Sequence, residues 1–327
     1  MKPSRIQEVL DQLLSNTWPV FIWGPPGVGK SSVVRRVAEQ NGLPLLDIRA
    51  SLLDPTDLRG IPSIQDGRAV WCPPEFLPRE EQPPGILFFD ELNAAPPLVQ
   101  ASLYQLTLDR RVGEYDLPEG WRIIAAGNRS EDVSVVFRMP AALSNRFIHV
   151  DFEIDFEDWR DWAVDTGIHP MVVGFLGVRR ELLFDMKNTD RGFPTPRSWE
   201  IVSDTLKAMG GYQASRDLLL GIVGEGAALE FLGYCEAAIT EEALMGILND
   251  PASARLPTDL GDLYALVSYA ASRARDEKVM EAAGVLLGRL EPELAVLLMR
   301  DVLRSNARFL MDTGYLAFVQ EHHESIV

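Results

Sequence analysis

Residues 24–31 of this 327-residue chain read Gly24-Pro25-Pro26-Gly27-Val28-Gly29-Lys30-Ser31. This stretch matches the pattern G-x-x-x-x-G-K-[ST], in which glycines let successive backbone N–H groups point inward at phosphate oxygens. The apolar run 20–23 precedes it, and an amphipathic helical stretch follows. A loop between a strand and a helix places phosphates at the positive end of the helix dipole. The segment therefore predicts a nucleotide-binding site.

The loop also assigns roles to single side chains. We expect Lys30 to reach the β- and γ-phosphates and the Ser31 hydroxyl to ligate Mg²⁺. The cofactors expected at this site are therefore ATP and Mg²⁺. The residues predicted to contact the nucleotide from this loop are Gly24, Pro25, Pro26, Gly27, Val28, Gly29, Lys30, Ser31 and Ser32.

Two carboxylates follow a second apolar run, Ile86-Leu87-Phe88-Phe89-Asp90-Glu91. Asp90 is expected to hold the Mg²⁺ through its water shell, together with Ser31. Glu91 is placed to polarise a water molecule for attack on the γ-phosphate. A kinase that transfers phosphate to a metabolite needs no dedicated water activator, so the pair favours an ATPase, which converts ATP and water to ADP and phosphate.

A third apolar run, residues 123–126, leads into Gly127-Asn128-Arg129. An amide at the tip of a strand beside the Asp90 strand is able to hydrogen-bond the attacking water or the γ-phosphate. The alternative is that Gly127 and Asn128 only form a turn. With the other two motifs present, we interpret Asn128 as a catalytic residue.

The order of apolar runs predicts the fold class. Continuous apolar strands that alternate with helices are typical of a parallel sheet covered on both faces, which is an α/β core. After about residue 155 the strand-like runs stop and helix-forming residues take over. The clearest helix is expected to start at Thr195 as N-cap, with Pro196 at its first position, and to end at Gly210. The second half is therefore predicted to be all helical.

Composition narrows the function and location. Hydrophobic residues make up 46% and charged residues 24%, as in ordinary globular proteins, and the net charge of −17 disfavours binding to nucleic acid. The two cysteines, Cys72 and Cys235, are too few for a disulfide framework or a zinc site. No apolar run approaches the length of a spanning helix. We expect a cytoplasmic protein with no membrane role.

Taken together, these motifs resemble those of the AAA+ ATPases, and among them the MoxR-like group. In that comparison residues 24–31 look like the Walker A loop, Asp90-Glu91 like the Walker B pair and Asn128 like sensor 1. Residues 141–147 are similar to the stretch that carries the arginine finger of this family. The resemblance thus implies Arg146 as the finger, with Arg138 and Arg129 as alternatives, and Arg197 as the sensor 2 arginine of the lid.

We expect an organisation in three parts, of which the resemblance covers roughly residues 5–240 and implies no role for the residues beyond. The three parts are an AAA+ α/β nucleotide-binding core at residues 1–155, a helical lid at 156–240 and a C-terminal helical extension at 241–327. Two hairpins are expected within the core. One turns at Asp66-Gly67, a strong signal for a tight turn, and the other lies within residues 111–121. In MoxR-like proteins such loops often face a ring pore and touch substrate, whereas the alternative is ordinary surface hairpins.

The function implied by the resemblance is an ATP-driven chaperone or remodelling motor. It would form a homo-oligomeric ring, expected to be a hexamer, that acts on a protein client with a partner carrying a von Willebrand factor A domain. Two alternatives stay open. One is an AAA+ motor that acts on nucleic acid, against which the net charge of −17 counts. The other is a monomeric nucleotide switch or small-molecule kinase, which leaves Arg146 and Arg197 without roles.

Overall fold

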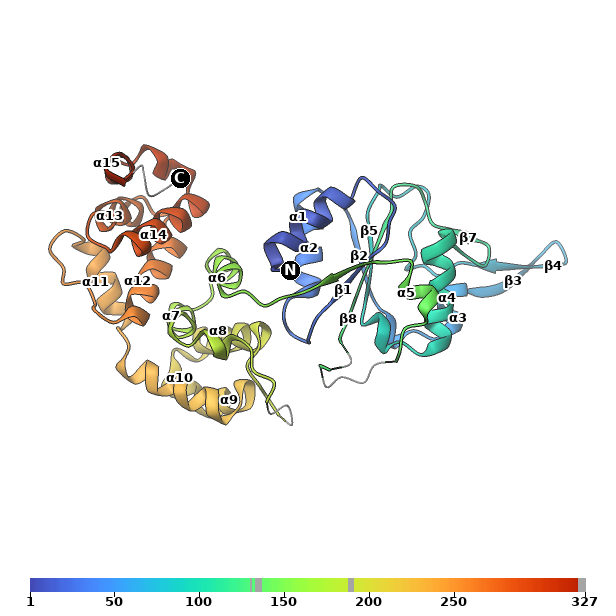
Figure 1. Ribbon diagram of the computed structural model, residues 1–327, viewed down its shortest axis with the longest axis horizontal. Helices are drawn as coiled ribbons and strands as arrows, with labels where there is room; N and C mark the ends of the chain where they lie inside the picture. The colour runs from blue at the N-terminus through green and yellow to red at the C-terminus, as the bar shows by residue number, and fades with distance from the viewer. Residues whose placement is uncertain (130, 133–136, 188–190, 323–327) are drawn as a thin grey trace. The chain divides into compact units, whose positions relative to one another are not determined.

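The computed structural model describes residues 1–129, 131–132, 137–187 and 191–322. The chain divides into two compact units, Met1–Asp155 and Phe156–Val327. The first contains all the strands that the structure describes, and the second is helical in its described residues (Figure 1). Each unit is described below by itself.

A five-stranded parallel sheet forms the centre of the first unit. Its strand order is β2-β5-β8-β1-β9, so the nucleotide-loop strand β1 lies between β8 and β9. The four apolar residues of β5 are fully buried, as expected for a central strand covered by helices on both faces. This arrangement confirms the predicted α/β core. The strands are β1 (Val20–Trp23), β2 (Leu45–Arg49), β5 (Ile86–Asp90), β8 (Arg122–Gly127) and β9 (Ile148–Asp151).

Helices cover this sheet. α1 packs on α2, while α4 packs on α3 and α5. The apolar side chains of α4 and β5 share a buried core with Phe21 of β1. The helical elements are α1 (Pro3–Leu13), α2 (Lys30–Gln40), α3 (Pro55–Arg59), α4 (Pro97–Asp109) and α5 (Ala141–Ser144), with the short 3₁₀ turns η1 (Ala50–Leu52) and η2 (Leu92–Ala94).

Two antiparallel hairpins accompany the sheet. In the first, β3 (Ile61–Gln65) pairs with β4 (Arg68–Cys72), and the turn residues Asp66 and Gly67 have φ of 50° and 74°. These positive φ values are those that the Asp-Gly sequence predicts. The second hairpin is shorter and consists of β6 (Arg111–Val112) and β7 (Tyr115–Asp116). Both expected hairpins are therefore present.

The second unit is a set of packed helices. α8 begins at a capping box, in which Thr195 and Ser198 each accept a hydrogen bond from the other's backbone N–H, and it ends at left-handed Gly210. No helix in the described part of the chain is long and apolar enough to span a bilayer. The elements are α6 (Phe156–Asp165), α7 (Pro170–Val178), η3 (Arg180–Leu183), α8 (Pro196–Met209), α9 (Tyr212–Val223), α10 (Glu225–Ala237), α11 (Glu241–Asn249), α12 (Leu260–Arg273), α13 (Glu277–Leu287), α14 (Pro292–Ser305), η4 (Ala307–Met311) and α15 (Thr313–His322).

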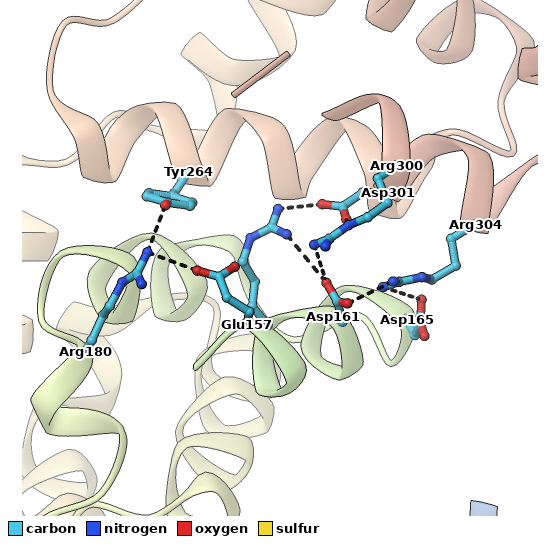
Figure 2. Close-up of polar contacts among 9 residues, drawn as sticks. Glu157, Asp161, Asp165, Arg180, Tyr264, Arg300, Asp301 and Arg304 are labelled. Carbon is cyan, nitrogen blue, oxygen red and sulfur yellow. Dashed lines mark hydrogen bonds and ion pairs between the residues drawn. The ribbon is translucent and has the colours of Figure 1, made fainter. Parts of the chain in front are cut away.

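Charged side chains join the start of this unit to its end. Arg160 on α6 forms an ion pair with Asp301 on α14, and both side chains are completely buried. Around this pair, Asp161 accepts from Arg300 at 2.6 Å and from Arg304 at 2.9 Å (Figure 2). Burial raises the pKa of Asp301 even though Arg160 opposes this shift. We call Arg160, Asp161, Arg300, Asp301 and Arg304 the α6–α14 network.

A further connection between the early and late helices of this unit runs through α12. α12 packs along α7 and also contacts α6. On η3, Arg180 pairs with Glu157 of α6 at 3.1 Å and donates to the Tyr264 hydroxyl of α12 at 3.2 Å (Figure 2). The helices from α6 to α15 therefore form one packed body.

Candidate nucleotide-binding site

The loop between β1 and α2 has the backbone shape that a phosphate cradle requires. Gly27 and Gly29 have φ of 75° and 102°, values that residues with a Cβ rarely adopt. Gly24 is constrained differently, because a Cβ added there would lie 2.9 Å from the Cβ of Phe152. The loop ends where α2 begins at Lys30, so its N–H groups meet the positive end of the helix.

Lys30 is held inside this loop. Its side chain is only 8% exposed, and Nζ donates to the carbonyl oxygens of Gly24 at 2.6 Å and Pro25 at 2.8 Å. Nζ also donates to Oδ1 of Asn128 at 2.9 Å. Asn128 reaches it because β8 pairs with β1 in parallel, which places both strand ends at the same edge of the sheet. Two residues predicted separately from the sequence are thus in direct contact.

Ser31 and Asp90 form the second contact of the site. The Ser31 hydroxyl donates to Oδ2 of Asp90 at 2.8 Å. Ser31 is the second residue of α2 and Asp90 is the last residue of β5. The fold therefore brings together two residues that are 59 positions apart in the sequence. A hydroxyl and a carboxylate are hard oxygen donors, and this donor set fits Mg²⁺.

Glu91 lies next to Asp90 in an unusual backbone conformation. Its φ is 54°, in the left-handed region, and its N–H donates to Oδ1 of Asp90 at 2.9 Å. The Glu91 carboxylate is exposed and accepts a hydrogen bond from the Ser51 hydroxyl at 2.6 Å. A carboxylate is a group that is able to accept a proton from a water molecule.

Asp47 adds negative charge to this edge of the sheet. It lies on β2 beside β5, and burial together with the nearby Asp90 charge raises its pKa, while Arg35 and Arg49 oppose the shift. The charges of Asp47 and Asp90 thus influence each other, although the described residues contain no cluster of three or more His, Cys, Asp or Glu side chains that could hold a metal ion.

The predicted arginines lie outside these contacts. Arg146 is exposed just after α5, and its guanidinium carbon lies 5.9 Å from the ring centre of Tyr104. Arg138 is exposed as well. Arg129 differs, because it pairs with Asp151 of its own chain at 3.0 Å. Arg197 belongs to the second unit, where it is exposed in the first turn of α8.

Comparison with known proteins gives the family. Residues 19–147 match the profile of the AAA domain of the dynein-related subfamily. The protein MoxR of Methylorubrum extorquens is 32% identical over 180 residues, which cover 53% of this chain and 47% of the relative. The matched segment is an AAA+ domain, and the similarity to MoxR supports a MoxR-like AAA+ protein.

Further matches agree in part. The protein NorQ of Paracoccus denitrificans is 27% identical over 153 residues, which cover 44% of this chain and 56% of that protein. The chain thus spans about half the length of these two curated relatives. Among solved structures, NtrX from Brucella abortus in complex with ADP overlays 98% of this chain and 67% of its own chain at 15% identity, with a TM-score of 0.41, too low to support a detailed comparison.

Two further residues of this AAA+ site, Ser51 and Asn93, were not predicted from the sequence. Ser51 follows β2 and reaches Glu91 because Arg49 is in register with Asp90. Asn93 is buried beside β8, where its Nδ2 donates to the Asn128 carbonyl at 2.6 Å and its Oδ1 accepts from the Asn128 N–H at 3.2 Å.

Asn93 therefore fixes the backbone of the predicted sensor 1 residue. A Cβ at Gly127 would lie 2.2 Å from Oδ1 of Asn93, so the glycine is needed for this close approach. The sequence signal that could have found Asn93 is a polar residue within the otherwise apolar stretch after Glu91. Such a buried amide requires hydrogen-bond partners.

Proposed function

We propose that this chain hydrolyses ATP to ADP and phosphate, and that it does so in a ring, expected to be a hexamer, that remodels a protein client. The observation that carries the proposal is the joined pair of contacts, Lys30 to Asn128 and Ser31 to Asp90, beside the carboxylate of Glu91. A loop for phosphates, a metal-binding oxygen pair and a base for water are the parts that ATP hydrolysis needs.

Binding of the substrate would use groups that are already oriented. The N–H groups of the loop and of the first turn of α2 point toward the phosphates of ATP. The Lys30 ammonium, held by two carbonyl oxygens and Asn128, would exchange at least one of these neutral acceptors for phosphate oxygen. A charged acceptor is the stronger partner, so this exchange is favourable.

Ser31 and Asp90 would hold Mg²⁺, the Ser31 hydroxyl directly and Asp90 through water. The ion, when bound, neutralises charge on the β- and γ-phosphates. Binding would require the present hydrogen bond from Ser31 to Asp90 to open, since the hydroxyl oxygen would then face the ion.

Glu91 would accept a proton from the attacking water. For this role its carboxylate must be oriented, and Ser51 restricts it at 2.6 Å before substrate binds. Asn128, with its backbone fixed by Asn93, would present its amide to the water or the γ-phosphate. The catalytic assignment is therefore Glu91 as base and Asn128 as a positioning group.

The proposal of a ring is based on the exposed arginine side chains. Arg146 is exposed and makes no ion pair among the described residues, so its guanidinium is available to a neighbouring subunit. Arg138 shares this availability, whereas Arg129 is bound by Asp151. We propose Arg146 as the arginine finger that reaches the γ-phosphate of the next subunit, and Arg197 as the arginine that contacts nucleotide from the lid.

The proposed client contact is the β3–β4 hairpin. Ile61 and Ile64 are 76% and 83% exposed there, which is unusual for large apolar side chains. Apolar groups on a projecting hairpin suit transient contact with an unfolded or loosely folded protein segment. A partner with a von Willebrand factor A domain is proposed from the MoxR-like resemblance.

The decisive experiment measures ATP hydrolysis and the solution mass by light scattering, with and without Mg-ATP. Glu91→Gln should bind Mg-ATP without turnover and shift to a mass of several subunits. Arg146→Ala should lose turnover and retain nucleotide binding, while the matched control Arg138→Ala should retain both.

Other outcomes would favour other functions. If Glu91→Gln stays monomeric with ATP bound, a finger acting between subunits has no target and a switch or kinase is favoured. Stimulation of hydrolysis by DNA or RNA that weakens as salt rises would instead indicate a nucleic-acid client. Full turnover in Arg146→Ala would reject Arg146 as the finger.

A further inference from the structure

Arg129 joins two strands that are not neighbours in the sheet. β8 and β9 lie on either side of β1, and Arg129 follows the end of β8. Its Nε and Nη2 lie 3.2 and 3.0 Å from Oδ1 of Asp151, the last residue of β9. Nη2 also donates to the carbonyl oxygen of Phe152 at 3.4 Å. The side chain therefore crosses the end of β1, where the phosphate loop begins.

Both ends of this crossing touch the nucleotide site. On one side, the residue before Arg129 is Asn128, which accepts from Lys30. On the other side, Phe152 donates its N–H to the Trp23 carbonyl at 2.7 Å and lies directly against Gly24, where no Cβ would fit. A movement of the end of β8 or β9 would therefore also displace Gly24, the first glycine of the loop.

The backbone of Arg129 is anchored while its side chain is not enclosed. Its N–H donates to Oδ2 of Asp132 at 2.6 Å, and the Asp132 N–H donates back to the Arg129 carbonyl at 3.1 Å. The partner Asp151 is largely exposed, so water competes for the ion pair. The two hydrogen bonds to Asp151 and the bond to the Phe152 carbonyl add to this ion pair, so the side chain has three contacts with the end of β9 and the residue after it.

We propose that Arg129 is a positioning residue that couples the state of the nucleotide site to residues 151–155, where the first unit continues into the second. The inference rests on the proposed ATP hydrolysis. Phosphate that draws Lys30 away from Asn128 releases the tip of β8, and Arg129 passes this displacement to Asp151. The segment that leads to Phe156 then shifts when nucleotide is bound and returns after release.

The experiment is a double-mutant cycle with Arg129→Gln, Asp151→Asn and the double variant. Two quantities are measured for each: kcat and KM for ATP, and the distance between spin labels with and without Mg-ATP. One label is attached to the exposed Cys72 and one to a cysteine replacing the exposed Met311, since Cys235 is buried. All variants carry this replacement.

A matched control is Arg5→Gln. Arg5 also forms an exposed ion pair in the first unit, with Glu8 at 2.7 Å, and lies outside the proposed machinery. The control and Arg129→Gln should have the same melting temperature within a few degrees. Only Arg129→Gln should change the two functional quantities.

The losses of kcat caused by the two substitutions are expected to be non-additive. Each single variant and the double variant should lose kcat by the same factor, roughly threefold to tenfold, with KM unchanged and a smaller label displacement. Wild-type kcat and displacement in Arg129→Gln would overturn the inference. So would additive losses, because Arg129 would then act through a group other than Asp151.

The outcome for the unsubstituted chain separates this inference from the proposed function. No ATP hydrolysis by the wild type would contradict the proposed function. Hydrolysis without any nucleotide-dependent displacement would leave the proposed function in place and overturn the coupling alone.

Discussion

The two units each contain a cluster of charged side chains, and the clusters are built in opposite ways. At the nucleotide site, Lys30 is satisfied by neutral oxygens, while the Glu91 carboxylate remains exposed with a single hydroxyl donor, Ser51. In the α6–α14 network the charges satisfy one another, and Arg160 and Asp301 are withdrawn completely from water.

This difference distinguishes a ligand-binding site from the α6–α14 network, whose role is structural. In the proposed function, phosphate and metal would replace neutral partners at the nucleotide site at little cost, because charged groups are the stronger partners. In the network no exchange is available, and three polar groups, Nε and Nη1 of Arg160 and Oδ1 of Asp301, have no hydrogen-bond partner among the described residues. The network joins α6 to α14, and removing one partner of a buried ion pair is strongly destabilising.

The largest expected effect is on the free energy of unfolding, when the α6–α14 network is changed. Arg160→Met should lower the free energy of unfolding by about 3–5 kcal/mol, because Asp301 loses its buried partner and is left with the exposed Arg300, whose Nε lies 3.7 Å from Oδ1. Chemical denaturation followed by circular dichroism measures this change. Arg160→Met/Asp301→Leu should recover most of the loss, and a double variant as unstable as the single one would contradict this account.

At the nucleotide site the effect should fall on rate rather than stability. Glu91→Gln should lower kcat roughly 10²-fold to 10³-fold, because the amide accepts no proton from water. Its unfolding free energy should stay within about 0.5 kcal/mol of the wild type, as for other exposed positions. A loss of several kcal/mol would show that the exposed site is structural after all.

A third test uses the pH dependence of stability to show whether the buried Asp301 charge destabilises Arg160→Met. Burial raises the pKa of Asp301, and removing Arg160, which opposes the shift, should raise it further. When the pKa of an acid is higher in the folded state than in the unfolded state, ionisation of that acid destabilises the fold at pH values above these pKa values. This destabilisation disappears as the pH falls to the unfolded-state pKa. The stability gap between Arg160→Met and wild type should therefore narrow as pH falls from 7 toward 4. A constant gap would exclude a buried Asp301 charge as its cause.

The smallest expected effect is at the rim of the network. Asp161→Asn should cost about 1 kcal/mol, because Asp161 is partly accessible and its bonds to Arg300 and Arg304 compete with water. Added salt should shrink this loss, whereas the loss in Arg160→Met should hardly change. Denaturation at low and high salt provides the comparison.

The same contrast explains what the sequence could predict. The phosphate loop, the Asp90-Glu91 pair and Asn128 each follow an apolar strand, so local patterns reveal them and the parallel sheet brings them together. Ser51 and Asn93 depend on sheet register and on burial, which no local pattern gives. The start and end of α8 were predictable because caps are local signals.

The Arg160–Asp301 pair could not be predicted at all. Its members lie 141 residues apart on two ordinary amphipathic helices, and each looks like a surface charge in the sequence. A buried ion pair has no periodic signature, because it occupies positions that the helical pattern assigns to apolar residues.

One feature of the sheet is its position along the chain. All five strands fall between Val20 and Asp151, and the edge strand β9 is the last of them, so the sheet is complete before the helical unit begins. The segment 19–147 that matches the family profile is nearly the same stretch. Helices that follow a finished sheet can be lengthened, exchanged or rebuilt without disturbing strand register. Strand order and register in the first unit therefore need no strand from the helical residues that follow Asp155.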